Sequence, residues 1–187
     1  ETGVYVARDL GFYKEQGLDV EIIQPGENTA EKIVALGQAE FGFSYQESVT
    51  IARSQGVQVK SLAAVIQHNS SGFASLKEAG ITSPKDFSGK RYGSSSWPSE
   101  LGILKQVMES SKADFDSVEV VHGIADFFTT IGKNADFEWI YYGWDGVQAR
   151  LKGIDINFIP VRDIDPIFDF YTPVLIASDL MVNSEPE

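Results

Sequence analysis

Cysteine is absent from this 187-residue chain, and histidine is scarce, with only His68 and His122. Without thiols there can be no disulfide, no thiolate metal site and no cysteine nucleophile. Two histidines without His-x-x-x-His spacing are too few for a metal site built from imidazoles. We therefore expect neither a metal ion nor another cofactor, and composition leaves the compartment open.

Basic residues are also scarce, because 15 Lys and Arg stand against 27 Asp and Glu, for a formal net charge of -12. An acidic protein repels nucleic acids and anionic membranes, so neither is an expected partner. Apolar runs long enough to span a bilayer are missing as well. The hydrophobic content of 43% is that of an ordinary globular protein.

Common catalytic motifs are missing too. The sequence contains no Gly-x-x-x-x-Gly-Lys phosphate loop, no Gly-x-Gly-x-x-Gly dinucleotide fingerprint and no Gly-x-Ser-x-Gly nucleophile elbow. Carboxylates are plentiful, but no spacing marks a catalytic pair. These absences predict a binding protein without catalytic residues rather than an enzyme.

Helix-like and strand-like segments alternate along the chain. Val4–Gln16 has small and apolar residues on one helical face, Leu18–Ile23 has the pattern of a strand, and Asn28 with Glu31 suggests a helix start. Further helices are expected over 46–54, 98–111, 125–132 and 145–152, and further strands over 39–44, 57–66, 73–76, 91–94, 118–121, 138–142, 156–161 and 173–176. This alternation predicts an α/β fold with largely parallel sheets.

Two breaks in this alternation predict two lobes. A polar stretch and a proline-containing return indicate crossings near residues 67–71 and 163–167. Residues 1–66 together with 168–187 then form lobe 1, and residues 72–162 form lobe 2.

Both ends of the chain are expected to be cut. The first residue is Glu1 rather than a methionine, and no basic and apolar leader is present, so lobe 1 is expected to be incomplete. At the other end, Ser184 as a cap and Pro186 in a first turn predict a helix that has no residues left to form.

Four loops pair an aromatic or imidazole ring with hydrogen-bonding groups, and each follows a predicted strand. They are Ser44–Glu47, Gln67–Gly72, Gly93–Glu100 and Tyr141–Asp145. Ligands in α/β layers bind beyond the carboxyl ends of strands, so these loops are the expected site. Rings beside hydrogen-bonding groups suit a flat heterocycle with polar edges.

The residues in these loops also have structural explanations. His68 is more readily a structural or interface histidine than a catalytic base, since no nucleophile or carboxylate lies beside it in the sequence to form a relay. Glu100 and Asp145 occupy positions where a helix dipole or an N-cap favours a carboxylate. Ser94–Ser96 resemble an anion cradle at a helix start, whereas Trp97 and Glu100 suit a neutral or cationic ring better than a phosphate.

Several segments resemble the solute-binding-protein family named for thiamine pyrimidine synthesis. The wide family is suggested by Val4–Ala7 and Gly11–Val20, and its pyrimidine-precursor-binding branch by Phe43–Gln46, Ile66–Phe73 and Tyr142–Gly146. The similarity extends over nearly the whole chain.

The resemblance implies an α/β fold like that of type II periplasmic binding proteins, with two lobes and a ligand cleft between them. It implies a monomeric extracytoplasmic protein, periplasmic or anchored as a lipoprotein, that hands a thiamine pyrimidine precursor to an ABC permease without performing chemistry. From the resemblance and the loops together, we expect the ligand-binding residues to be Tyr45, Gln46, His68, Asn69, Ser70, Trp97, Glu100, Tyr142, Trp144 and Asp145.

This chain departs from the branch just before Glu100. The branch usually has a Gly-Gly-Trp-Gly-Ser-Pro-like loop there. In this chain Trp97 instead directly precedes the proline and follows a run of serines. Riboflavin or another flat ring system, and a sulfonate or phosphate anion, stay open as ligands. An enzymatic role is a further alternative, because eukaryotic relatives make the pyrimidine. They do so with a reactive lysine, pyridoxal phosphate and a cysteine-rich motif, and this chain has no cysteine.

Overall fold

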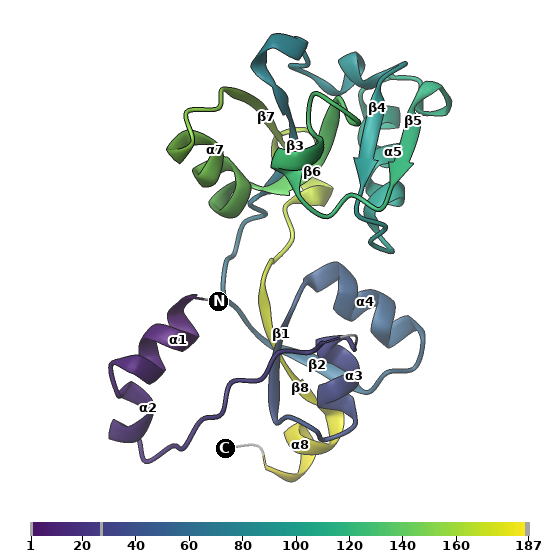
Figure 1. Ribbon diagram of the computed structural model, residues 1–187. Coiled ribbons are helices and arrows are strands. Elements are labelled where there is room, and N and C mark those ends of the chain that lie inside the picture. Colours follow the sequence, from purple (N-terminus) through teal and green to yellow (C-terminus); the bar gives the residue numbers. More distant parts are fainter. Residues whose placement is uncertain (1, 27, 186–187) are drawn as a thin grey trace. The chain divides into compact units, whose positions relative to one another are not determined.

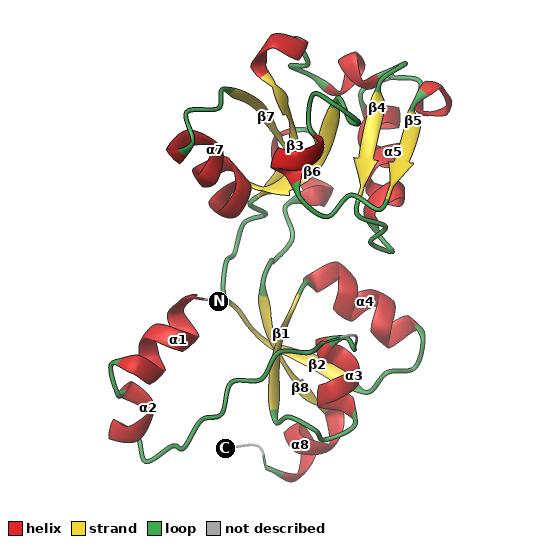
Figure 2. Ribbon diagram, viewed as in Figure 1, coloured by secondary structure: helices red, strands yellow, loops and turns green. Residues whose placement is uncertain are grey.

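The computed structural model describes residues 2–26 and 28–185 (Figures 1 and 2). The helices are α1 (Thr2–Asp9), α2 (Phe12–Glu15), α3 (Ala30–Ala35), α4 (Gln46–Ser54), α5 (Glu100–Ser110), α6 (Phe127–Thr130), α7 (Val147–Leu151) and α8 (Asp179–Ser184). The strands are β1 (Phe41–Ser44), β2 (Val59–Ala64), β3 (Ser71–Leu76), β4 (Arg91–Ser94), β5 (Glu119–His122), β6 (Phe137–Tyr141), β7 (Ile156–Pro160) and β8 (Val174–Ser178). Within the described ranges, every helix is too short or too polar to cross a membrane.

The chain folds into two compact units. Unit 1 contains the residues up to Val65 and those from Pro173 onward, and unit 2 contains Ile66–Thr172. Unit 2 is therefore continuous in sequence, whereas unit 1 is assembled from two separate parts of the chain.

Unit 1 is built on an antiparallel sheet with the strand order β1-β8-β2. Helices α3 and α4 bring Val34 and Val49 to this sheet, where they pack with Val59, Val174 and Ile176 in one apolar cluster. The middle strand, β8, is the last of the three in sequence. The sheet is thus completed only by long-range pairing.

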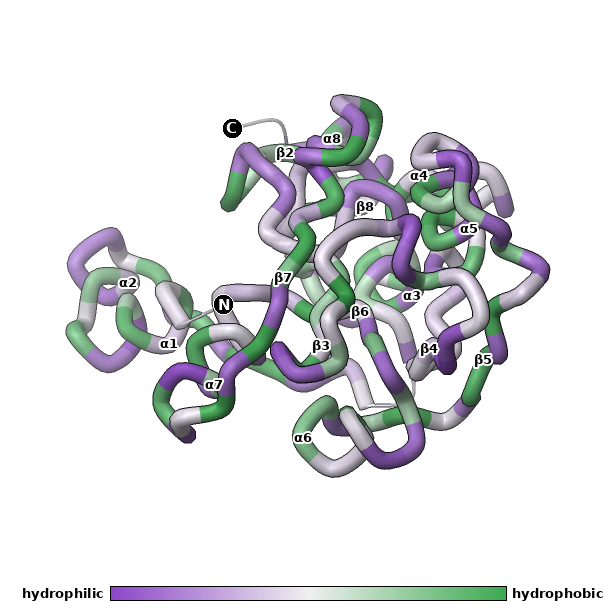
Figure 3. Tube along the Cα trace, turned by 90° about the horizontal axis from the view of Figure 1, so that it is seen from above, coloured by the Kyte–Doolittle hydropathy of each residue, from purple (hydrophilic) through white to green (hydrophobic). Residues whose placement is uncertain are grey.

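The first part of unit 1 differs from the sequence prediction. The expected helix over 4–16 is divided into α1 and α2 at Gly11, which has a positive φ of 81°. Leu18–Ile23 is not a strand, and Leu18 and Ile23 are about half exposed. A strand needs a partner for its backbone N–H and C=O groups, and none of the described strands pairs with this segment. Figure 3 shows hydrophobic and polar residues interspersed along α1 and α2.

Unit 2 has a five-stranded sheet with the order β5-β4-β6-β3-β7. β4 is parallel to β5 and β6, while β3 is antiparallel to β6 and β7. The prediction of largely parallel sheets is therefore wrong for unit 1, and in unit 2 it holds only for the pairing of β4 with β5 and β6. Local periodicity identifies a strand, but its direction depends on partners that are distant in sequence.

One face of this sheet carries an aromatic core. The rings of Phe87 and Phe137 stack with centroids 4.1 Å apart, and Phe73 meets both of them edge-on. Leu104 and Met108 of α5 are fully buried against the same cluster, and α5 lies beside β4 and β5 in Figure 1. Each such side chain stabilises the fold by about 1.5 to 3 kcal/mol when buried.

The side chains of β6 point alternately to the two faces of the sheet. Phe137 and Trp139 pack on the aromatic core, whereas Ile140 joins a smaller apolar cluster with Phe127 of α6. Because side chains alternate along a strand, Glu138 lies on the side of Ile140. A carboxyl group is therefore placed on the face of the sheet that carries the smaller apolar cluster.

The C-terminal helix α8 was not predicted from the sequence. The hydroxyl of Ser178 caps it by accepting a hydrogen bond from the backbone N–H of Met181 at 3.1 Å. Ser184 is the last residue of α8 rather than the cap of a new helix. Pro186, the other residue of that prediction, lies outside the described residues.

Candidate functional site

A cavity of about 250 Å³ lies in unit 2 where β4 and β6 separate. These two strands pair only through Tyr92 with Phe137 and Gly93 with Glu138. From β4 the chain continues to β5 on one side and then to β6 on the other, and such a reversal of strand order is the usual ligand position in an open α/β sheet. The cavity is lined by Gly93, Ser95, Glu100, Ile124, Ala125, Asp126, Phe127, Phe128, Glu138, Trp139, Ile140, Trp144, Asp145 and Gln148.

Glu138 is the most buried carboxylate of this lining after Glu100, with 3% of its surface exposed. Its neighbour on β4 is Gly93, and a Cβ atom there would stand 2.7 Å from Glu138 Cγ. Oε1 of Glu138 makes a 2.6 Å hydrogen bond with Thr130 Oγ1. The glycine thus leaves the room that the Glu138 side chain occupies.

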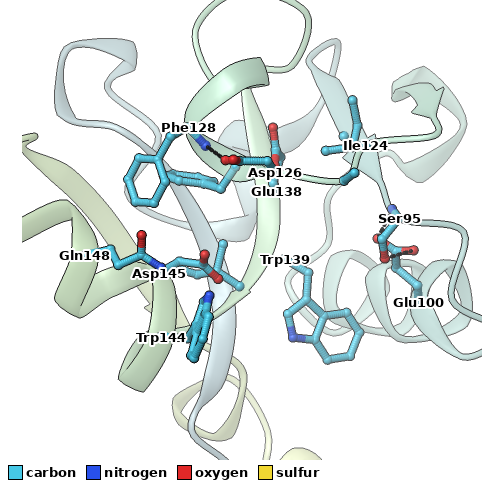
Figure 4. Close-up of a pocket in the computed structure, with 14 residues that line it drawn as sticks. Ser95, Glu100, Ile124, Asp126, Phe128, Glu138, Trp139, Trp144, Asp145 and Gln148 are labelled. Atoms are coloured by element: carbon cyan, nitrogen blue, oxygen red, sulfur yellow. Dashed lines mark hydrogen bonds between the residues drawn. The ribbon is translucent and has the colours of Figure 1, made fainter. Parts of the chain in front are cut away.

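Two aspartates join Glu138 at the cavity. Asp126 caps α6, and its Oδ1 accepts a hydrogen bond from the backbone N–H of Phe128 at 2.8 Å. Asp145 lies on a π-helical turn, Tyr142–Gly146, that leads from β6 into α7. Such turns within helices often occur at functional sites. Figure 4 shows Asp126 and Glu138 near each other, while Glu100 lies apart beside Ser95.

The electrostatics of the cavity are dominated by acidic groups. Burial raises the pKa of Glu138 from 4.5 to about 7, against the opposing effect of the hydrogen bond from Thr130, and the charges of Asp145, Asp126 and Glu100 raise it further. Burial also raises the pKa of Asp145. No Lys or Arg is among the lining residues, and no group of His, Asp or Glu in the described parts of the chain is arranged to hold a metal ion.

Glu100 has a different environment, because its own loop supplies its hydrogen-bond donors. The Tyr92 hydroxyl donates to Oε1 at 2.6 Å, and the Ser94 hydroxyl donates to Oε2 at 3.0 Å. Ser95 donates through both its backbone N–H and its hydroxyl, and the Trp97 backbone N–H donates to Oε2 at 3.1 Å. The serine-rich loop therefore holds an internal carboxylate rather than an external anion.

Three of the predicted binding residues, Glu100, Trp144 and Asp145, line the cavity. Trp97 and Tyr142 are not among the lining residues, and both are nearly half exposed. The ring of Tyr142 packs on the ring of Phe158 in β7, with 4.9 Å between the two ring centroids.

The predicted residues His68, Asn69 and Ser70 lie where the chain enters unit 2. His68 Nδ1 is 2.7 Å from Asp169 Oδ2, and this hydrogen bond lowers the pKa of Asp169. Asn69 is fully buried, and its side-chain amide donates to the backbone oxygen of Phe168 at 2.8 Å. The backbone oxygen of Ser70 accepts from the Tyr142 N–H at 3.1 Å. These contacts connect the polar stretch to Phe168 and Asp169 within unit 2.

The remaining two predicted residues belong to unit 1. Tyr45 precedes α4 directly, and Gln46 is its first residue. Beside them, the Ser44 hydroxyl donates to the buried Glu31 carboxylate. Glu47 Oε2 is buried without a hydrogen-bond partner in the described structure, and burial raises the pKa of Glu47. The carboxyl end of β1 therefore also gathers acidic groups.

Sequence reasoning missed Glu138, Asp126 and the adjacent phenylalanines of α6. A signal for Glu138 was present, since it is the only charged residue of the segment Phe137–Tyr141. A charge inside an apolar strand is seldom buried without a partner or a purpose. Asp126 had no comparable signal, because its position depends on the fold of α6 against the sheet.

Comparison with known proteins places these features in a context. The family model described as "NMT1/THI5 like" matches residues 1–187. A formylaminopyrimidine-binding protein of Halalkalibacterium halodurans is 33% identical over 190 residues, covering 100% of this chain and 57% of that protein. A 4-amino-5-hydroxymethyl-2-methylpyrimidine phosphate synthase of Legionella pneumophila is 33% identical over 93 residues, covering 49% of this chain and 29% of that protein. The chain thus spans little more than half the length of the first relative.

Among solved structures, the periplasmic aliphatic sulphonate-binding protein SsuA of Escherichia coli has a TM-score of 0.76 at 12% sequence identity. The match covers 97% of this chain and 59% of that structure. At this identity the likeness concerns the fold alone, and it confirms the predicted α/β fold of periplasmic binding proteins.

Proposed function

The chain belongs to the NMT1/THI5-like family, and on this premise we propose that the protein is an extracytoplasmic solute-binding protein for a thiamine-related aminopyrimidine. It delivers this ligand to the membrane permease of an ABC importer and performs no chemistry on it. The observation that carries the proposal is the unit 2 cavity, in which carboxyl groups stand beside aromatic rings.

The polar chemistry of the cavity suits an amino-substituted ring. Asp126, Glu138 and Asp145 offer hydrogen-bond acceptors, and an exocyclic amino group offers the matching N–H donors. Trp144 and Phe128 provide faces on which a flat ring can stack. A ligand without N–H donors would leave the buried Glu138 carboxyl without a partner from the ligand, so the site discriminates against it.

The same chemistry argues against a sulfonate or phosphate ligand. An anion in this cavity would face several carboxylates, and no Lys or Arg is among the described lining residues. The sulphonate-binding protein SsuA of Escherichia coli shares the fold at 12% identity and carries no weight for the ligand. The cavity volume of about 250 Å³ lies just below the usual range for drug-sized ligands, which favours one ring over a fused ring system such as riboflavin.

A binding role is better supported than an enzymatic one. The relative that is matched over the whole chain is named as a binding protein, whereas the Legionella pneumophila synthase is matched over 49% of the chain. The cavity lining also contains no lysine amine that could form a Schiff base.

Isothermal titration calorimetry on the full-length protein tests this proposal. We expect saturable binding of formylaminopyrimidine or 4-amino-5-hydroxymethyl-2-methylpyrimidine, and no binding of an alkanesulfonate, inorganic phosphate or riboflavin. Binding of the sulfonate without binding of either aminopyrimidine would refute it.

A matched pair of variants locates the site. Asp145→Asn removes a charged acceptor from the cavity and should weaken aminopyrimidine binding by about tenfold to a hundredfold. Asp163→Asn makes the same change at an exposed side chain and should leave the affinity unchanged. Equal affinities of the two variants would place the ligand elsewhere.

A further inference from the structure

We propose that the cavity of unit 2 binds the aminopyrimidine as a cation, with a proton on a ring nitrogen. The ring N–H donates to Oε2 of the Glu138 carboxylate, and Asp126 and Asp145 help to balance the positive charge. This inference rests on the proposed function, because it assigns a charge state to the ligand class named there.

The lining of the cavity carries negative charge that its own residues leave uncompensated. Glu138, Asp126 and Asp145 all border the cavity, and no Lys or Arg is among the described lining residues (Figure 4). A fourth carboxylate, Glu100, already accepts hydrogen bonds from its own loop and from Tyr92. Carboxylates that lose their water on ligand binding need a partner of opposite charge, which a cationic ring provides and a neutral ring does not.

Glu138 presents one oxygen to the ligand. The residue is 3% exposed and borders the cavity. Its Oε1 accepts a hydrogen bond from the Thr130 hydroxyl at 2.6 Å. Its Oε2 has no hydrogen-bond partner within the described residues. Each oxygen of the carboxylate then has one donor, Thr130 for Oε1 and the ring N–H for Oε2.

The surroundings of Thr130 leave its single proton for Glu138. Thr130 Oγ1 also lies 2.9 Å from the backbone oxygen of Asp126. That oxygen has two other donors, the hydroxyl of Thr129 at 2.9 Å and the backbone N–H of Thr129 at 3.2 Å. The Asp126 oxygen therefore stays hydrogen-bonded when Thr130 donates to Glu138, as a carboxylate requires.

The charged groups around Glu138 favour a cation beside it. Burial raises its pKa to about 7, and the charges of Asp145 on the π-helical turn, Asp126 before α6 and Glu100 of α5 raise it further. Tyr92 of β4 is neutral, because burial keeps its pKa well above 10.0. A positive charge in the cavity acts in the opposite direction, so Glu138 is expected to be ionised in the complex.

One basic side chain lies near this group, and it does not replace the ligand. Lys152 of α7 lowers the pKa of Asp145, and its ammonium group lies 3.8 Å from the ring centroid of Phe128. This single cation stands against three carboxyl groups. Trp144 borders the cavity as well, and a tryptophan face attracts a cation more strongly than the other aromatic rings do.

Calorimetry in buffers of different ionisation enthalpy counts the proton. A free aminopyrimidine is neutral near pH 8, so binding as a cation should take up close to one proton. 4-Aminopyridine is a stronger base and is already a cation near pH 8, so it should bind with almost no proton exchange. Absence of proton uptake with the aminopyrimidine would overturn the inference.

Nuclear magnetic resonance shows where this proton lies. With ¹⁵N at both ring nitrogens of 4-amino-5-hydroxymethyl-2-methylpyrimidine, the complex near pH 8 should give one nitrogen the chemical shift of the protonated ring. The free ligand in acid supplies the reference value. Neutral-ring shifts for both nitrogens would place the proton on a carboxyl group of the protein and would overturn the inference.

Matched variants test the source of the charge. Asp126→Asn removes one negative charge but keeps a side-chain oxygen that can cap α6. We expect it to weaken aminopyrimidine binding about tenfold, since a nearby opposite charge shifts a pKa by about one unit or more. Glu138→Gln should weaken binding at least as much, whereas Asp163→Asn at an exposed position should have no effect. Unchanged affinity in both cavity variants would contradict the proposed charge balance.

The two proposals fail in different ways. If no aminopyrimidine binds the wild-type protein, the proposed function falls and the charge assignment falls with it. If an aminopyrimidine binds and its ring nitrogens stay neutral in the complex, only the charge assignment falls.

Discussion

Glu100 and Glu138 are both buried, but their hydrogen bonds give them different chemistry. Glu100 accepts from residues of its own loop and from Tyr92, so its charge is compensated inside unit 2. Glu138 has one hydrogen-bonding neighbour among the described residues, Thr130, and faces the cavity. A buried carboxylate with few partners is a source of pH dependence, and this leads to a prediction about stability.

The free energy of unfolding should decrease as pH rises from about 4.5, where Glu138 loses its proton in the unfolded chain, to about 7, where it does so in the folded protein. The pKa of Glu138 is raised from 4.5 to about 7, so between these values the folded protein binds more protons than the unfolded chain. Glu138→Gln removes this penalty and should stabilise the protein by up to about 3 kcal/mol near pH 8, at about 1.4 kcal/mol per pH unit. Thermal unfolding near pH 4 and pH 8 checks this, and an equal effect of the variant at both would contradict it.

A substitution at Gly93, with Gly102 as the control, tests whether the Glu138 side chain needs the space beside Gly93. In Gly93→Ala the new methyl group would approach Glu138 Cγ to 2.7 Å and Ala135 Cβ to 2.9 Å. We expect a loss of about 1 to 3 kcal/mol in the free energy of unfolding, together with weaker ligand binding. Gly102→Ala on α5 meets no atom within 4 Å and should be neutral or stabilising, because alanine favours a helix. Urea titration of both variants gives the comparison.

The sequence allowed part of this site to be predicted. Glu100, Trp144 and Asp145 were found because they follow strands in loops rich in rings and polar groups. Glu100 was expected to bind the ligand, but sequence could not show that its carboxylate accepts hydrogen bonds from residues up to eight positions away. Glu138 escaped notice because its burial depends on Gly93, which is adjacent only in the folded sheet.

The path of the loop from β4 to α5 depends on one side chain. The Glu100 carboxylate collects donors from Ser94, Ser95 and Trp97 and so fixes the path of the chain into the first turn of α5. The helix dipole adds to this effect, because a carboxylate is favoured at a helix N-terminus.

Replacing this carboxylate should loosen the loop. Glu100→Ala leaves several buried donors unpaired, and we expect a loss of about 2 to 4 kcal/mol in the free energy of unfolding. Hydrogen exchange at the Ser95 and Trp97 amides should become faster than in the rest of unit 2. Glu109→Ala, at an exposed position near the end of the same helix, serves as the control. Unchanged exchange at Ser95 in Glu100→Ala would contradict this account.

Elements with strong local signals were predicted well. The bounds of α4 and β4 agree with the expected 46–54 and 91–94, since periodicity and flanking residues mark both. Leu18–Ile23 was predicted wrongly, although its composition is that of a strand. Composition reports how a segment fits a sheet, but pairing requires a neighbouring strand, which periodicity cannot supply.

In the molecule as a whole, the two segments that connect the units meet inside unit 2. Asn69 joins them, since its backbone N–H donates to Asp169 and its side chain donates to the Phe168 oxygen. Its Oδ1 also accepts from the backbone N–H and the hydroxyl of Ser71. A single buried amide therefore links the outgoing and returning chain.

Asn69→Ala should weaken this link. We expect a loss of about 2 to 3 kcal/mol in the free energy of unfolding and faster hydrogen exchange over residues 69–71 and 168–169. His68→Gln alters an exposed side chain in the same segment and should cost less than about 1 kcal/mol. Similar losses in the free energy of unfolding for both variants would mean that the exposed His68–Asp169 pair, not the buried Asn69 amide, holds the segments together.

The fold class of the whole chain was predictable, whereas its strand directions were not. Alternating helix and strand signals predicted an α/β fold, and the likeness to periplasmic binding proteins confirms it. The antiparallel pairing of β3 with β6, and of β8 with β1, was missed because these partners are distant in sequence.

The position of β8 in the middle of the unit 1 sheet has a consequence for biosynthesis. Phe41 of β1 pairs with Ala177, and Val59 of β2 pairs with Ser178, so both outer strands leave the ribosome long before the strand that joins them. Unit 2 is translated in full during this interval and can fold first. Until β8 is made, β1 and β2 have open edges that invite aggregation, so a nascent chain stalled before β8 should depend on chaperones more than the finished protein does.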